Sequence, residues 1–287
     1  MEANDLLKKV RRIEIKARGL SRHIFAGEYQ SAFKGKGMAF SEVREYQYGD
    51  DIRNIDWNVT ARFNHPYIKV FEEERELTVM LLIDVSGSSD FGSNFQLKRE
   101  IITEIAAVLA FSAIHNNDKI GVIFFSDKIE KFISPQKGKK HILRIIRELI
   151  DFKPESRETK ISEALRYLTN IIKKRCTAFV ISDFFDHDFE NALRIANNKH
   201  DVIGLNIFDK REYEIPDVGL VRIKDAETGK LLWLDTSQKK VRDYYRSMRM
   251  SGNAKLIEIF SKAGVDYVDL ETGEDYVRPL MKLFKKR

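Results

Sequence analysis

The amino-acid sequence predicts an α/β fold, with a doubly wound, mostly parallel sheet preceded by a small N-terminal β-rich subdomain. Three observations predict it. From residue 77 onward, short apolar segments alternate with longer helix-like ones. Several of the short segments, such as IGVIFF, are apolar without interruption, as parallel strands covered on both faces are. Residues 25–76 differ, because they are rich in glycine and aromatic residues and then turn polar.

The elements of the first quarter follow in order. Residues 5–24 carry apolar side chains at helical spacing, which predicts an amphipathic helix. In the next segment, YGDDIRNIDW has the composition of turns and Tyr67–Phe71 that of a strand. The predicted organisation is therefore an N-terminal helix within 1–24, a β-rich subdomain over 25–76 and an α/β domain over 77–287.

The α/β domain is expected to alternate strands and helices. The expected strands are Leu77–Ile83, Lys119–Phe125, Lys128–Ile133, Cys176–Ile181, Asp201–Phe208 and Val265–Leu270. The expected helices span about 94–116, 139–151, 161–174, 187–199, 237–263 and 275–285.

Three details refine this arrangement. Only a Ser126-Asp127 turn separates the second and third strands, so we expect a hairpin and one antiparallel edge strand. The helix at 94–116 is apolar around most of its circumference, which predicts a central position. The segment VRIKDAETGKLLWLD predicts a second hairpin, inserted before the long helix.

Composition and charge exclude several classes of protein. The formal charge is +6, but residues 1–24 and 277–287 together carry +9, and no stripe of alternating basic and aromatic residues follows. Nucleic-acid binding is therefore not expected. No apolar run approaches the roughly 20 residues of a membrane helix, and the N-terminus lacks the pattern of a signal peptide. Cys176 begins an apolar run and is expected to be a buried structural thiol, and the expected location is cytoplasmic.

Hydroxyl and carboxylate side chains end the first strand of the α/β domain. In VMLLIDVSGSSD, the strand stops at Asp84, and Ser86 and Ser88 follow at alternate positions. Ligands of open α/β sheets bind beyond the carboxyl ends of the strands, and alternate spacing can aim these three oxygens at one point. Oxygen ligands suit Mg²⁺, Mn²⁺ or Ca²⁺ rather than zinc, so the pattern predicts a divalent cation, Mg²⁺ first.

DVSGS is similar to the Asp-x-Ser-x-Ser motif of von Willebrand factor type A domains, whose metal-ion-dependent adhesion site lies on a Rossmann-like sheet. That resemblance implies two further ligands, a threonine from a second loop and an aspartate after a later strand. Thr159 and Asp183 stand at the matching positions of this sequence. The implied metal ligands are therefore Asp84, Ser86, Ser88, Thr159 and Asp183.

The upstream segment from Gly27 to Trp57 resembles the signature of a bacterial domain-of-unknown-function family (DUF58 type), whose members place this block before an A-type domain. The matching residues are Gly27, Ser31, Phe33, Gly35, Gly37, Phe40, Glu42, Arg44, Tyr46, Gly49, Asp50, Arg53, Asp56 and Trp57. The resemblance implies association with MoxR-type AAA+ ATPases and no established catalytic activity. We therefore expect a non-enzymatic adaptor whose metal binds a carboxylate of that ATPase or of its client.

Ordinary structural roles compete with this interpretation. Ser86 and Ser88 could bind turn amides, Thr159 could be a helix N-cap, and Asp183, Asp186 or Asp188 could cap the segments that follow the strand. Gly35-Lys36-Gly37 lacks the spacing of a phosphate-binding loop. The charged residues around Trp57 are expected to form a structural network that holds the subdomain to the sheet.

The alternative function is a Mg²⁺-dependent phosphatase-like hydrolase with Asp84 as nucleophile. Such enzymes resemble DxDx[TV], in which the second aspartate is the general acid. Ser86 stands at that position here, and its hydroxyl cannot take this role at neutral pH. The sequence therefore favours a binding module over a hydrolase.

Overall fold

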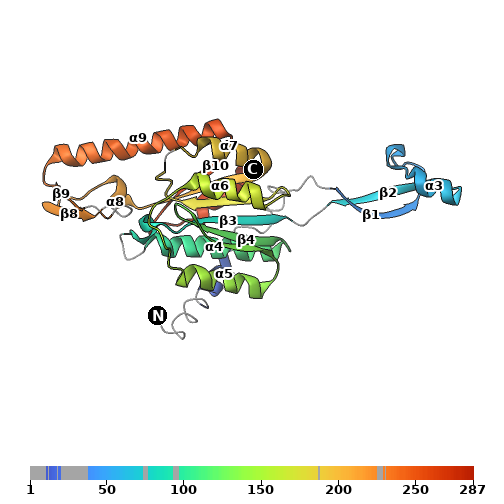
Figure 1. Ribbon diagram of the computed structural model, residues 1–287, viewed down its shortest axis with the longest axis horizontal. Coiled ribbons are helices and arrows are strands. Elements are labelled where there is room, and N and C mark those ends of the chain that lie inside the picture. The colour runs from blue at the N-terminus through green and yellow to red at the C-terminus, as the bar shows by residue number, and fades with distance from the viewer. Residues whose placement is uncertain are drawn as a thin grey trace. The chain divides into compact units, whose positions relative to one another are not determined.

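The computed structural model describes residues 11, 13–17, 19–20, 38–73, 77–92, 97–186, 188–224, 229 and 231–287 (Figure 1). The chain divides into two compact units. Met1–Ala32 and Thr78–Arg287 form the larger unit, and Phe33–Leu77 form the smaller one. Gly27, Ser31, Phe33 and the Gly35-Lys36-Gly37 segment, together with most of the predicted N-terminal helix, lie outside the described residues.

The larger unit contains a six-stranded sheet with the order β10-β7-β6-β3-β4-β5. Five strands are parallel, and β5 pairs antiparallel with β4 at one edge. The strands are β3 (Thr78–Asp84), β4 (Lys119–Phe125), β5 (Ile129–Gln136), β6 (Thr177–Ser182), β7 (Asp201–Phe208) and β10 (Asp266–Glu271). The predicted fold class and the antiparallel edge strand are confirmed.

Helices cover both faces of this sheet (Figure 1). They are α4 (Lys98–His115), α5 (Lys139–Asp151), α6 (Ile161–Ile171), α7 (Glu190–Lys199), α9 (Lys239–Ala263) and α10 (Val277–Lys286). Side chains from α6, α7 and α9 pack with Met80 and Leu82 of β3 in one core cluster. On the other face, Phe284 of α10 meets Phe179 of β6. Burial of most of α4 confirms its predicted central position.

Burial in the core accounts for the composition and position of the strands. Every residue of β3 from Val79 to Asp84 is buried, because helices cover both faces of this central strand. Gly204 in β7 is required by a close approach: a Cβ at this position would lie 2.6 Å from the ring of Phe260. The sheet therefore presents the carboxyl end of β3 on a rigid support.

The second hairpin also forms, with β8 (Leu220–Lys224) paired antiparallel to β9 (Leu231–Asp235). The short helix α8 (Lys210–Tyr213) was not predicted. Helix α7 begins at Glu190 rather than 187, since Phe184 and Asp188 have positive φ angles that a helix does not allow. Helix α6 ends at Ile171, because Ile172 is already extended.

The smaller unit pairs β1 (Met38–Glu45) with β2 (Tyr67–Glu73) and adds η1 (Ile52–Asn54) and α3 (Trp57–Phe63). Helix α3 was not predicted. It begins at Trp57, the last residue of the stretch YGDDIRNIDW, because Asp56 accepts hydrogen bonds from Asn58 N and Val59 N as its N-cap. The ion pairs of the charged block, Arg44–Asp50, Arg53–Asp51 and Lys69–Asp56, each join residues of this unit. These ion pairs act within the unit, and the predicted role of the charged block in holding the unit to the sheet stays a prediction.

Cys176 is a buried structural thiol, as predicted. Its Sγ lies 3.3 Å from Nδ1 of the buried His200. Burial raises the pKa of the Cys176 thiol to about 12 and lowers the pKa of His200 to about 4. Both side chains are therefore neutral near pH 7, and the pair lacks the thiolate that nucleophilic catalysis requires.

Candidate metal centre

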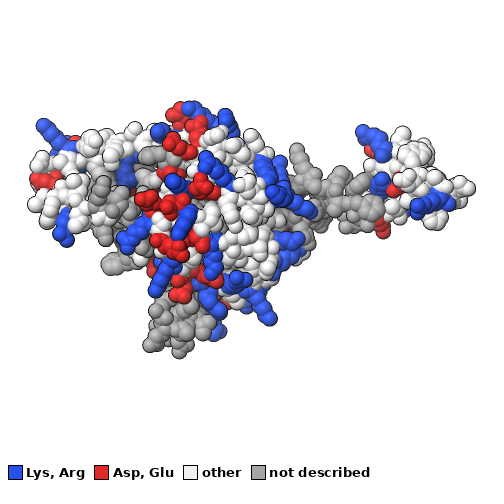
Figure 2. All heavy atoms as spheres, in the orientation of Figure 1, with Lys and Arg blue, Asp and Glu red and all other residues white. Residues whose placement is uncertain are grey.

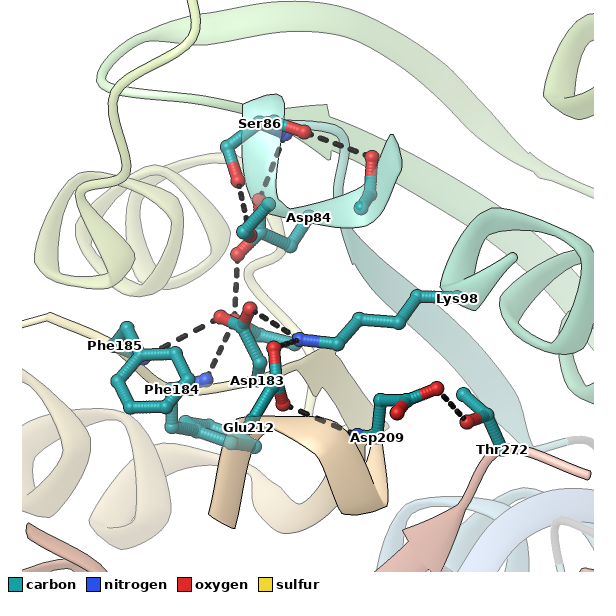
Figure 3. Close-up of polar contacts among 12 residues, drawn as sticks. Asp84, Ser86, Lys98, Asp183, Phe184, Phe185, Asp209, Glu212 and Thr272 are labelled. Atoms are coloured by element: carbon teal, nitrogen blue, oxygen red, sulfur yellow. Dashed lines mark hydrogen bonds and ion pairs between the residues drawn. The ribbon is translucent and has the colours of Figure 1, made fainter. Parts of the chain in front are cut away.

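The candidate site lies where β3 and its neighbour β6 end (Figure 3). Asp84, the last residue of β3, is buried. Its Oδ2 accepts a hydrogen bond of 2.5 Å from Oγ of Ser182, the last residue of β6. This contact fixes the carboxylate of Asp84 beside the segment that carries Asp183, so parallel pairing brings two predicted ligands from distant parts of the chain to one edge.

Ser86 and Ser88 lie in the turn that follows Asp84. The Ser86 amide donates to Asp84 Oδ1 at 2.9 Å, which folds the turn back over the carboxylate. The two hydroxyl oxygens are 3.1 Å apart. Ser86 is the N-cap residue of η2 (Gly87–Asp90), but its side chain makes no capping hydrogen bond. Both hydroxyls therefore face one another rather than the amides of the turn.

Thr159 is buried in the loop before α6. That loop meets the serine turn, because Gly87 N donates to Arg157 O at 3.0 Å. The residue at the N-cap of α6 is Lys160, not Thr159, and the first amide of the helix, Ile161 N, donates to Asp186 Oδ2 at 2.7 Å. Asp186 thus caps α6 rather than the next helix, and it ties the Asp183 segment to the Thr159 loop.

Asp183 has a partner that the sequence interpretation missed. Lys98, the first residue of α4, is 1% exposed, and its Nζ lies 2.8 Å from Asp183 Oδ2. The same Nζ pairs with Glu212 Oε1. A buried ammonium therefore bridges a predicted metal ligand and a carboxylate of α8, as Figure 3 shows.

Helix α8 positions Glu212. Asp209 and Glu212 form a capping box, in which Asp209 N donates to Glu212 Oε2 at 3.1 Å. Thr272, just after β10, donates to Asp209 Oδ2 at 2.6 Å. The sequence DKRE after an apolar strand carries the capping-box spacing, so this helix start was recognisable. Nothing in the sequence paired it with Lys98, more than a hundred positions away.

Phe184 holds the segment after Asp183 in an uncommon conformation. This buried aromatic residue has a φ of 54°, a region that bulky residues rarely adopt. Its amide donates to Ser182 Oγ at 3.0 Å, and its ring packs edge-on against Phe260 with centroids 5.1 Å apart. Packing therefore fixes a strained turn that directs Asp183 inward and Phe185 outward.

The charges of the centre do not balance. Burial and the nearby charge of Asp183 raise the pKa of Asp84 to about 7. Burial also acts to lower the pKa of Lys98, but the charges of Asp183 and Glu212 outweigh it and the pKa is raised. Burial raises the pKa of Glu212 as well, although the charge of Lys98 opposes this. With all three carboxylates ionised and Lys98 protonated, the buried cluster would carry a net charge of −2, and the raised pKa values of Asp84 and Glu212 indicate that this full charge is unfavourable without a further cation. A divalent cation would offset this charge, and carboxylate and hydroxyl oxygens are the donors that such a cation prefers.

A cation bound at this site would need hydroxyl ligands in addition to carboxylates. Within the ranges that the structure describes, no three Asp, Glu, His or Cys side chains gather as a ligand set. The donors on hand are two carboxylates, Asp84 and Asp183, with the hydroxyls of Ser86, Ser88 and Thr159 in adjoining loops. This donor set is poor in charge and rich in neutral oxygen, which suits a cation that keeps a position open for another ligand.

The chain is similar to several known proteins. An uncharacterised protein of Mycobacterium tuberculosis is 26% identical over 285 residues, which make up 98% of this chain and 90% of that protein. The crystal structure of an aerotolerance-related membrane protein from Bacteroides fragilis covers 74% of this chain and 100% of its own, with 15% identity and a TM-score of 0.51. The structure of the SpRpn10 VWA domain covers 74% of this chain and 95% of its own, with 12% identity and a TM-score of 0.39.

Among the described helices, none is both long and apolar enough to cross a membrane. The family described as "Protein of unknown function DUF58" matches residues 42–254, which include the serine turn, Lys98, Thr159, Asp183 and α8. This match spans most of the chain, from β1 of the smaller unit into α9, and so the chain belongs to the DUF58 family.

Proposed function

We propose that the chain is a non-enzymatic protein-interaction module that binds its partner through a shared divalent cation, with Mg²⁺ the expected ion. The observation that carries the proposal is the buried, net-negative group of oxygens at the ends of β3 and β6. Asp84 and Asp183 would supply charge, and Ser86, Ser88 and Thr159 would supply neutral oxygens. When bound, the ion would offer a contact for a carboxylate of the partner.

The chain's own residues prepare this contact. Ser182 and the Ser86 amide hold both oxygens of Asp84 by hydrogen bonds, so the carboxylate needs little reorganisation on binding. Lys98 occupies one oxygen of Asp183, which leaves fewer protein charges for the ion itself. An ion held mainly by neutral oxygens stays under-neutralised, and an incoming Asp or Glu side chain restores the balance.

A MoxR-type AAA+ ATPase of the same organism, or a client of that ATPase, is the proposed source of the carboxylate. We expect the Asp84→Ala/Ser86→Ala variant to bind it at least about 30-fold more weakly than the native chain in Mg²⁺, as loss of a desolvated charge contact does. Affinity is measured by biolayer interferometry in Mg²⁺ and in excess chelator.

The variant is the decisive comparison, because chelation also removes the Mg²⁺ that an ATPase itself requires. Ser261→Ala, an exposed hydroxyl near the C-terminal end of α9, is the matched control and should bind as the native chain does. Circular dichroism checks that each variant is folded. Equal affinities of the native chain and the double variant would mean that the partner contacts another surface.

We further propose that Asp84 does not act as a nucleophile. Its buried carboxylate accepts two hydrogen bonds, and a serine stands at position 86 where a phosphatase of this kind needs an acid. A panel of phosphate and acyl esters incubated with Mg²⁺ should give no turnover above buffer. Metal-dependent turnover that Asp84→Ala abolishes would establish the hydrolase instead.

A further inference from the structure

The larger unit carries an arm beside the candidate metal centre. We define the arm as β8, β9 and residues 239–250 of α9. Helix α9 is 25 residues long, but its buried residues are only Leu256, Phe260 and Ala263, near its C-terminal end. Its first half therefore stands away from the sheet, and Figure 1 places it with β8 and β9 at one end of the unit.

Three arginines on one side of α9 anchor the arm. Arg242 donates to Ser237 O at 3.0 Å, at the base of the hairpin. Arg246 pairs with Glu214, which follows α8, at 3.7 Å. The Arg249 guanidinium lies 4.1 Å from the ring centroid of Phe185, two residues beyond Asp183. The arm is thus attached to the same segments that hold Glu212 and Asp183.

The arm exposes large apolar side chains on both faces of its two-stranded sheet. Trp233 is 62% exposed, and Arg222 lies over its ring on one face. Leu232, the next residue along the strand, is 64% exposed and points to the opposite face. Leu220 and Leu231 of the hairpin and Tyr244 and Met248 of α9 are exposed too. Several large exposed apolar side chains in one small substructure are typical of an interaction site.

The charge of the arm is strongly positive. Residues 218–250 contain eight Lys and Arg against four Asp and Glu, so this segment carries +4 of the chain's formal +6. Figure 2 shows basic side chains, with some acidic ones, among uncharged surface at the end of the larger unit where Figure 1 places β8 and β9. Such a surface is complementary to an acidic partner that also carries apolar side chains.

We infer that the arm is the docking surface for an acidic, apolar-bearing segment of the partner protein. This inference rests on the proposed function, since the docked segment would place one of its carboxylates at the metal centre that the arm adjoins. Polypeptide is favoured over a bilayer because the apolar residues lie on both faces of a thin ribbon, and a flat membrane can cover only one. Among the described residues β8 and β9 pair only with each other, so a peptide can also add to an edge of this ribbon.

The test selects phage-displayed random peptides on the full chain in Mg²⁺. Selected sequences should be enriched in Asp and Glu together with Leu, Phe or Trp. A selected peptide is then titrated by fluorescence anisotropy against variants. Trp233→Ser and the Lys239→Glu/Lys240→Glu pair should each weaken binding at least about 30-fold, because central aromatic and charged contacts dominate such interfaces. Ile195→Ser on α7, which removes a comparably exposed apolar side chain, should leave the affinity for the peptide unchanged.

The outcomes separate this inference from the proposed function. Peptide binding that needs the arm but is equal in Mg²⁺, in chelator and in Asp84→Asn supports the arm and contradicts the shared cation. Binding that needs Mg²⁺ but is unchanged by the arm variants overturns the arm. Selected peptides without acidic enrichment overturn it as well. The arm inference is also overturned if no peptide is selected and the native chain instead associates with phosphatidylserine vesicles, or with itself, in a way that Trp233→Ser abolishes.

Discussion

Lys98→Met is expected to lower the free energy of unfolding by about 3–5 kcal/mol, the usual cost of removing one partner from a buried ion pair. The methionine keeps most of the volume of the lysine side chain, so the loss comes from charge rather than from a cavity. Asp183 and Glu212 would remain buried, 3% and 7% exposed at their side chains, without the ammonium between them. Urea denaturation, with a circular dichroism signal, measures the difference.

Two further variants make the result specific. Lys128→Met removes the ammonium of an exposed pair with Glu155 and should cost no more than about 1 kcal/mol. Lys98→Met/Glu212→Gln removes one stranded carboxylate and should recover part of the lost stability. If Lys98→Met instead resembles Lys128→Met, the two carboxylates are hydrated or protonated, and Lys98 is not their counter-ion.

The fold was predictable because its signals are local. Uninterrupted apolar runs and helical spacing located the strands and helices of the larger unit within a few residues, since burial on both faces leaves no freedom in composition. Helix α3 escaped because its seven residues give too short a pattern for helical periodicity, and its capping aspartate lies in a run of other turn-forming residues. Helix α8, with four residues, is also too short for helical periodicity, and only its capping box could have revealed it.

The candidate site was predictable only in part. Alternate oxygens after a buried strand identified Asp84, Ser86 and Ser88, and resemblance to a family supplied Thr159 and Asp183. Lys98 and Glu212 carry no signal of a shared site, because a lysine at the start of a helix and a glutamate in a capping box are ordinary surface residues in most sequences. Only the folded chain brings them to Asp183, and this contact changes the charge of the centre.

Asp84→Asn is expected to separate stability from cation binding. Asparagine has the shape of aspartate, and its side-chain oxygen can still accept from the Ser86 amide, which lies 2.9 Å from Asp84 Oδ1. Without a divalent cation, the variant should be at least as stable as the native chain, because it removes one of two buried carboxylates that repel each other. The free energies of unfolding of the native chain and of Asp84→Asn should respond differently once Mg²⁺ is added.

Mg²⁺ at about a hundred times its dissociation constant should raise the free energy of unfolding of the native chain by about 2.7 kcal/mol and that of Asp84→Asn by close to zero. The native chain would therefore pass from the less stable to the more stable of the two, and such a crossing cannot arise from a purely structural role of Asp84. Thermal and urea denaturation across a Mg²⁺ titration measure it, with Asp151→Asn, an exposed carboxylate at the end of α5, as the matched control. Equal stabilisation of all three proteins by Mg²⁺ would mean that the ion binds elsewhere on the chain. If Mg²⁺ stabilises none of them, the ammonium of Lys98 is the only counter-ion of these carboxylates and the centre binds no Mg²⁺.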